Sequence, residues 1–238
     1  MDTKELLKDS NNNLPAIRKA EDLSINFPQN RILKEKEQDN IKKAVKKGGI
    51  VSSEGRCYIN KENIPQLLVT DKKAVAKIYN NAQENDKYED GSNQYLSISE
   101  VNKNIDERIQ QPRGALEHER FKYAQECINA LRDQEELVLE RHIEADRIAK
   151  DRSSITKKKI KENNITQCQL SGEVFENDAR GHHIERVADD PRKARDLENI
   201  IVVKDAVHKA IHNKGAESRE SLKEFIKENE YETPDNLK

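Results

Sequence analysis

Four of the six histidines of this 238-residue chain, His182, His183, His208 and His212, lie within a stretch of 31 residues. His208 and His212 are four positions apart, so on a helix both imidazoles project from the same face. Two imidazoles at this spacing can bind one metal ion, and the His182-His183 pair can supply a further ligand. The spacing therefore predicts a metal site.

The two adjacent histidines precede the helical pair by 25 residues or more. Neighbouring side chains on a β-strand point to opposite faces, so His182 and His183 need not have the same role. One can bind the metal while the other acts as a base beside it. Neutral imidazole is suited to both tasks near pH 7.

The segment around the histidines has strand character at Gln167–Leu170, at Gly181–Val187 and, most strongly, at Asn199–Val203. Asp205 is expected to cap a helix over Ala206–Asn213, which Gly215 ends. The residues expected to form the hydrophobic core of this module are Leu170, Val174, Phe175, Ile184, Leu197, Ile200 and Ile211.

This order of residues resembles the HNH endonuclease motif. His182-His183-Ile184 is followed by Asn199 sixteen residues after His183, by His208 nine residues later and by His212 after four more. The resemblance covers about residues 165–215 and includes Cys-x-x-Ser-Gly at the start and the string DLENIIVV. It implies a C-terminal ββα-metal module, in a His-rich variant similar to the nuclease colicins.

The resemblance also implies roles for the matching residues. His183 corresponds to the general base, and His182, His208 and His212 correspond to ligands of one divalent metal ion. Asn199 corresponds to the residue that holds the loop between the two strands. The implied reaction is phosphodiester hydrolysis in DNA, with RNA as the alternative substrate. Mg²⁺ or Mn²⁺ is expected to support turnover, and an imidazole-rich site can also bind Zn²⁺.

The chain departs from the family pattern at two places. Many members bind a structural zinc through paired cysteines, but here Ser171 stands at the position that would pair with Cys168, and no structural zinc is expected. The proline often seen after the HHI string is absent, and Pro191 comes later. The loop Ala188–Asp196 is therefore expected to have its own shape.

Basic residues precede and flank the motif. Residues 147–161 contain seven cations and one carboxylate, among them Lys157, Lys158 and Lys159. These three lysines, with Arg180 and Arg186, are candidate nucleic-acid contacts, because phosphate contacts dominate the affinity of proteins for nucleic acids. The alternative is an ordinary solvated helix end and linker.

The remainder of the chain carries no recognised motif. We expect a disordered tail over 1–15, a mixed α/β domain of unknown role over 16–112, a long helix with a basic linker over 113–160, and the nuclease domain over 161–238. Within 16–112, a hairpin is expected around Gly55. Helices are expected at 30–47, 71–81 and 99–110, a short strand at 63–70 and a loop at 84–94.

The longest periodic segment, 115–151, predicts a single helix with an apolar stripe through Phe121, Ala124, Ile128 and Leu131. This stripe fits a helix packed within one subunit as well as it fits a homodimer or a protein partner contacting residues 115–150. After the motif, residues 217–238 predict a terminal helix followed by a frayed end.

Composition limits the classes of protein. Charged residues make up 37% of the chain and hydrophobic residues 34%, and no apolar run approaches the length of a membrane span. Three scattered cysteines do not form a disulfide framework, which favours a reducing cytoplasm.

These observations predict an α+β protein: a mostly helical N-terminal and central region with a small hairpin, followed by the HNH module. The expected function is that of a cytoplasmic, metal-dependent HNH endonuclease, in phage defence, as a nuclease of a phage or mobile element, or as an intracellular toxin. The alternative is a catalytically inactive module that binds nucleic acid or protein through the same fold.

Overall fold

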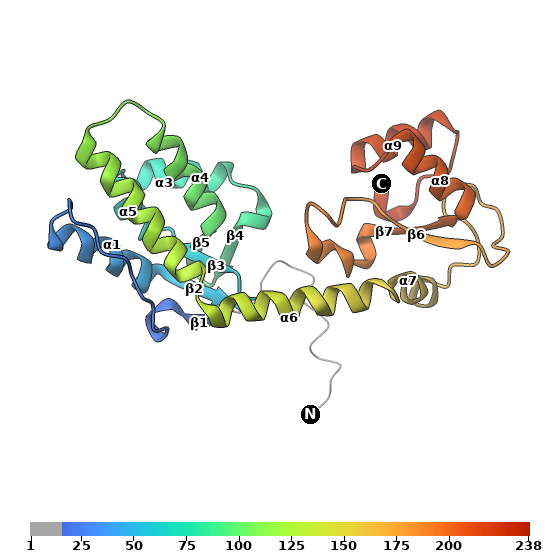
Figure 1. Ribbon diagram of the computed structural model, residues 1–238. Helices are drawn as coiled ribbons and strands as arrows, with labels where there is room; N and C mark the ends of the chain where they lie inside the picture. Colours follow the sequence, from blue (N-terminus) through green and yellow to red (C-terminus); the bar gives the residue numbers. More distant parts are fainter. Residues whose placement is uncertain (1–15) are drawn as a thin grey trace. The chain divides into compact units, whose positions relative to one another are not determined.

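A computed structural model describes residues 16–238, with side chains from Arg18 onward, as an α+β fold (Figure 1). The expected disordered tail, 1–15, lies outside the described residues. The described residues form two compact units, one up to residue 142 and the other over residues 143–238. This division falls within one helix and differs from the expected boundaries after residues 112 and 160, because helices on either side of it pack into different cores.

The first unit contains a five-stranded antiparallel sheet with the strand order β1-β2-β3-β5-β4. The strands are β1 (Ala16–Lys19), β2 (Gly49–Ser52), β3 (Cys57–Asn60), β4 (Lys87–Asp90) and β5 (Asn93–Ser97). The expected hairpin is the β2–β3 pair, and Gly55 in its turn adopts a left-handed conformation with φ of 70°.

The segment 84–94 was expected to be a loop, and this expectation is wrong. It contains β4 and the start of β5, which pair antiparallel around a turn at Gly91. Tyr88 and Tyr95 pair across the two strands, and both are buried. The strand signal was hidden because the other three residues of this short strand, Lys87, Glu89 and Asp90, are charged.

Five helices complete the first unit, together with the start of a sixth. They are α1 (Glu35–Gly48), α2 (Ile64–Leu68), α3 (Lys72–Asn81), α4 (Ile98–Ile109) and α5 (Ala115–Arg132). The expected strand at 63–70 is instead the short helix α2, with Pro65 in its first turn, where a missing N–H is tolerated. Asp71 caps α3 by accepting a 2.8 Å hydrogen bond from the Ala74 amide.

The single helix expected over 115–151 is two helices, α5 and α6 (Glu135–Arg152), separated at Asp133 and Gln134. Neither Gly nor Pro marks this break, and the apolar stripe continues across it. The break lets Leu137 of α6 pack into the same core as Leu131 of α5. The four stripe residues of α5 are fully buried in the first unit, so they pack within the subunit.

The second unit places two strands and four helical segments around a smaller core. Its elements, after the end of α6, are α7 (Ile155–Asn163), β6 (Ala179–His183), β7 (Ile200–Lys204), α8 (Asp205–Lys214) and α9 (Arg219–Glu228). Strands β6 and β7 pair antiparallel, with His182 opposite Ile201 and His183 opposite Ile200. Helix α8 follows β7 directly and contacts both strands.

Helix α7 packs closely on β6 at Gly181. A Cβ atom at this glycine would lie 2.3 Å from Oγ1 of Thr156, so any larger residue would push the helix away from the strand. This contact is part of the reason that α7 belongs to the second unit and is not a linker.

The core of the second unit contains three of the seven expected residues, Leu170, Ile184 and Ile211, and Phe175 packs against it while partly buried. Ile200 is fully buried, and Leu197 is half-buried. Val174 is 68% exposed, so its expected core position is wrong. The strand expected at Gln167–Leu170 is reduced to one bridge between Gln167 and Val174. The expected frayed end is also wrong, since Leu237 is fully buried in this core.

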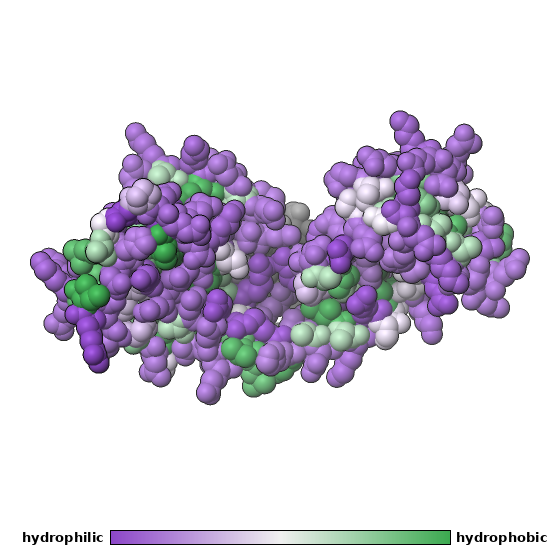
Figure 2. All heavy atoms as spheres, turned by 45° about the horizontal axis from the view of Figure 1, so that its top comes forward, coloured by the Kyte–Doolittle hydropathy of each residue, from purple (hydrophilic) through white to green (hydrophobic). Residues whose placement is uncertain are grey.

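Polar residues cover most of the face seen in Figure 2, with hydrophobic residues in small groups between them. No helix among residues 16–238 combines the length and the apolar character that a membrane crossing requires.

Candidate metal and catalytic site

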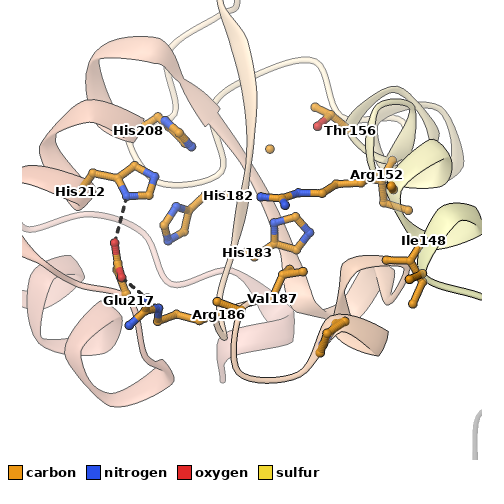
Figure 3. Close-up of a pocket in the computed structure, with 16 residues that line it drawn as sticks. Ile148, Arg152, Thr156, His182, His183, Arg186, Val187, His208, His212 and Glu217 are labelled. Atoms are coloured by element: carbon orange, nitrogen blue, oxygen red, sulfur yellow. Dashed lines mark hydrogen bonds and ion pairs between the residues drawn. The ribbon is translucent and has the colours of Figure 1, made fainter. Parts of the chain in front are cut away.

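Strand β6 and helix α8 bring three histidines together. His182, His208 and His212 each offer a ring nitrogen, and these atoms all lie within 4.8 Å of one another. The ring centroids are 4.6 Å apart for the two helical residues and 5.2 and 5.5 Å from His182 to His212 and His208 (Figure 3). Three converging imidazoles with room for further ligands form a donor set typical of catalytic metal sites.

His182 supports this assignment most directly. Its side chain is 3% exposed, and its Nε2 atom is buried without any hydrogen-bond partner. Burial, followed by the proximity of His208 and His212, lowers the pKa of His182 to about 3. The ring is therefore neutral and keeps a lone pair. An orphaned nitrogen beside two other imidazole donors fits a divalent transition metal, for which imidazole is a good ligand.

His212 is oriented by a carboxylate that sequence reasoning missed. The Nδ1 atom of His212 lies 3.3 Å from Oε1 of Glu217, and Oε2 of Glu217 lies 3.2 Å from the Arg186 guanidinium. A carboxylate on one ring nitrogen fixes the proton there and leaves the other nitrogen for a metal. Glu217 follows His212 by five residues, beyond the end of α8, so no helical periodicity pointed to it.

His183 lies in the same pocket but outside the three-histidine group. Its Nε2 atom is 3.5 Å from the carbonyl oxygen of Ala194. Because a carbonyl only accepts, Nε2 carries the proton and Nδ1 is left as an acceptor. Burial lowers the pKa of His183; the hydrogen bond to Ala194 opposes this shift, and the charge of Arg152 adds to it.

Asn199 connects the two ends of the loop between β6 and β7. Its Nδ2 atom donates to the carbonyl oxygens of Glu185, at 3.0 Å, and Lys193, at 3.3 Å. Its Oδ1 atom accepts from the Glu185 amide at 2.8 Å. The side chain is 4% exposed, so these bonds form away from water. Since Lys193 precedes Ala194, Asn199 also fixes the carbonyl that His183 contacts.

One pocket of about 690 Å³ contains all four histidines. Its wall is completed by residues of α6 and α7, including Arg152 and Thr156. In Figure 3 the Arg152 side chain extends toward the ring of His183. This arginine is exposed, and no carboxylate among the described residues pairs with it. Sequence reasoning placed Arg152 in a basic segment and did not include it in the site.

The five predicted nucleic-acid contacts occupy different environments. Arg180 pairs with Asp205 at 2.8 Å, and Arg186 pairs with Glu217. Lys157 and Lys158 are exposed on α7, on the wall of a second pocket that Lys161 also lines.

Lys159 is different from its neighbours. Its side chain is 3% exposed, and its Nζ atom lies 3.7 Å from a carboxylate oxygen of Glu198. The buried Lys159 ammonium would have to leave Glu198 to reach a phosphate, whereas Lys157 and Lys158 are exposed. It lies on the face of α7 that packs on the unit, together with the buried Ile155.

Cys168 is buried in the core of the second unit, where its Sγ atom accepts from the Ser171 amide at 3.4 Å.

Comparison with protein-family models, with curated proteins and with solved structures finds no match for this chain.

Proposed function

We propose that this protein is a metal-dependent endonuclease of the HNH type that hydrolyses phosphodiester bonds in DNA. The observation that carries the proposal is one pocket in which three histidines converge and a fourth, His183, lies apart from them with one ring nitrogen held by a carbonyl. A group of metal-binding histidines and a separate general base in one pocket are the two components that metal-dependent phosphodiester hydrolysis needs.

His182, His208 and His212 would hold one divalent cation. Bound there, the cation supplies positive charge that stabilises the phosphate and the leaving oxygen as negative charge develops on them. The all-imidazole donor set suits Zn²⁺ and similar transition metals better than Mg²⁺, which prefers oxygen ligands.

His183 accepts the proton of the attacking water at Nδ1. The water oxygen forms a bond to phosphorus, and the bond between phosphorus and the 3′ oxygen breaks. Solvent protonates the leaving oxygen, so the products carry a 5′-phosphate and a 3′-hydroxyl. Asn199 contributes by bonding the Lys193 carbonyl, next to the Ala194 carbonyl that Nε2 of His183 contacts, and so supports the orientation in which Nδ1 meets the water.

Arg152 is the second protein group that would meet the substrate. Its guanidinium is unpaired among the described residues and lies beside His183. A guanidinium can donate two parallel hydrogen bonds to a phosphate, which would place the phosphorus near the base.

The test is cleavage of supercoiled plasmid DNA and of RNA in the presence of Mg²⁺, Mn²⁺ or Zn²⁺. Wild type is compared with His183→Ala and with the matched control His142→Ala, which changes an exposed histidine outside the pocket. We expect wild type and the control to cut, and His183→Ala to lose at least about a hundredfold in rate.

Calorimetric titration with Zn²⁺ accompanies this assay. His183→Ala should retain metal affinity, while His208→Ala should lose it. If wild type cuts no more than His183→Ala with any metal, the proposed activity is wrong. Retained DNA binding in that case would favour the alternative, an inactive binding module.

A further inference from the structure

The segment Pro234–Lys238 lies against the loop that carries Asn199. The Asn236 Nδ2 atom donates to the carbonyl oxygen of Glu198 at 2.9 Å and to that of Ile200 at 3.1 Å. These two carbonyls belong to the residues immediately before and after Asn199. A single carboxamide therefore fixes the backbone on both sides of that residue.

The segment is itself firmly held. Leu237 is fully buried in the core of the second unit, and Pro234 is buried as well. The Asn236 carbonyl accepts from the Arg219 guanidinium at 3.0 Å, and the Glu232 amide donates to Leu170 at 3.0 Å. Asn236 is thus presented from a fixed position and does not depend on its own two hydrogen bonds for placement.

A continuous series of contacts runs from Asn236 to His183. Asn236 fixes the backbone around Asn199, and the Asn199 side chain bonds Glu185 and the Lys193 carbonyl. The next carbonyl, that of Ala194, contacts Nε2 of His183.

We propose that Asn236 is a positioning residue for His183, and that Pro234–Lys238 acts as a clamp on the loop between β6 and β7. The expected effect of Asn236 on cleavage rests on the proposed nuclease function. The expected effect of Asn236 on the structure of the loop is independent of that function.

The first test is amide hydrogen exchange of the metal-free protein, without substrate. The Glu185 amide donates to the Asn199 side chain, and the Ile184 amide donates to the Asn199 carbonyl at 2.8 Å, so both report on the loop. In Asn236→Ala both amides should exchange about tenfold faster, the ratio expected when two ordinary hydrogen bonds are lost. Asp235→Ala, which removes an exposed carboxylate paired only with Lys238, is the matched control and should change neither amide.

The second test is kinetic. In Asn236→Ala we expect kcat for plasmid cleavage to fall about tenfold with KM and Zn²⁺ affinity unchanged, because no metal-site histidine contacts the clamp. Combining Asn236→Ala with Asn199→Ala should cost little more than Asn199→Ala alone, since both act through one loop. Additive losses would mean that Asn236 acts only on general stability.

Asn236→Asp provides a second variant, because it keeps the shape and loses the donor. Unchanged exchange of the Glu185 amide in both folded variants would overturn the clamp, whether or not the wild type cuts DNA. Absence of cleavage by wild type would overturn the proposed nuclease function, and the hydrogen-exchange result would still decide whether Asn236 fixes the loop.

Discussion

The Nδ1 atom of His212 lies 3.3 Å from Oε1 of Glu217, and this carboxylate also pairs with Arg186. The contact gives the candidate metal site an orienting residue outside the three histidines. It also accounts for Arg186, which sequence reasoning assigned to DNA and which the structure places on Glu217.

Replacing Glu217 should therefore weaken metal binding. We expect Glu217→Ala to reduce Zn²⁺ affinity by about ten- to a hundredfold and Glu217→Gln, which keeps an acceptor oxygen, by less. Isothermal titration calorimetry measures both. Glu224→Ala, which removes an exposed carboxylate from α9, is the control. Equal affinity in Glu217→Ala and wild type would remove Glu217 from the site.

Arg152 should affect substrate more than metal. In Arg152→Ala we expect kcat/KM for plasmid cleavage to fall by about ten- to a hundredfold, because a charged hydrogen bond to phosphate is lost. Zn²⁺ affinity should not change. Lys150→Ala removes an exposed cation from the same helix outside the pocket and should leave kcat/KM nearly unchanged. An equal loss in the two variants would indicate general charge attraction and no specific contact.

Substitutions of the exposed and the buried lysines of α7 should have different effects. If α7 contacts DNA, Lys157→Ala should lower the salt slope of DNA binding by about 0.9, the effect of one phosphate contact, and leave stability unchanged. Lys159→Ala should leave the slope unchanged and lower the free energy of unfolding by about 1–2 kcal/mol, since its buried stem packs in the unit. Fluorescence anisotropy across a salt series and urea titration separate the two effects. An unaltered salt slope in Lys157→Ala would show that Lys157 makes no phosphate contact.

The buried thiols of the first unit should be unreactive. Burial raises the pKa of Cys57 to about 12 and that of Cys127 to about 11. At pH 8 both are protonated in the folded state, so a thiol reagent such as Ellman's reagent should modify them only on unfolding. Rapid modification of the native protein would contradict this burial.

The same pKa shifts predict how stability depends on pH. Both thiols have a folded pKa above the unfolded value near 9, so their contribution is complete below pH 9 and is lost as pH rises toward 12. A Cys57→Ala and Cys127→Ala double variant should show a shallower loss of stability over that range. Identical pH profiles for variant and wild type would show that the thiols do not titrate differently on folding.

Several elements followed from local sequence alone. The i, i+4 spacing of His208 and His212 places both on one face of α8, because the helical repeat leaves no alternative. The turn of the β2–β3 hairpin could be placed at Gly55, which tolerates a positive φ that other residues resist. Asp71 and Gly215 marked helix ends because capping involves only neighbouring residues.

Other elements were misjudged where local signals were absent or misleading. The break between α5 and α6 contains neither Gly nor Pro, and it follows from where Leu131 and Leu137 pack. The strand β4 has a charged face, so its pairing with β5 depends on the contact of Tyr88 with Tyr95. In each case the packing of apolar side chains, and no Gly, Pro or alternating pattern, marks the local structure.

The sequence by itself determined the candidate site's histidines and Asn199, because their types and spacing are fixed along the chain. Only the tertiary structure decided which residues surround them. It placed Glu217, Arg152 and Asn236 near the site and removed Lys159 from the exposed surface. The reason is physical: backbone geometry fixes neighbours within one turn or strand, whereas the partners of a side chain across the core depend on how separate elements pack.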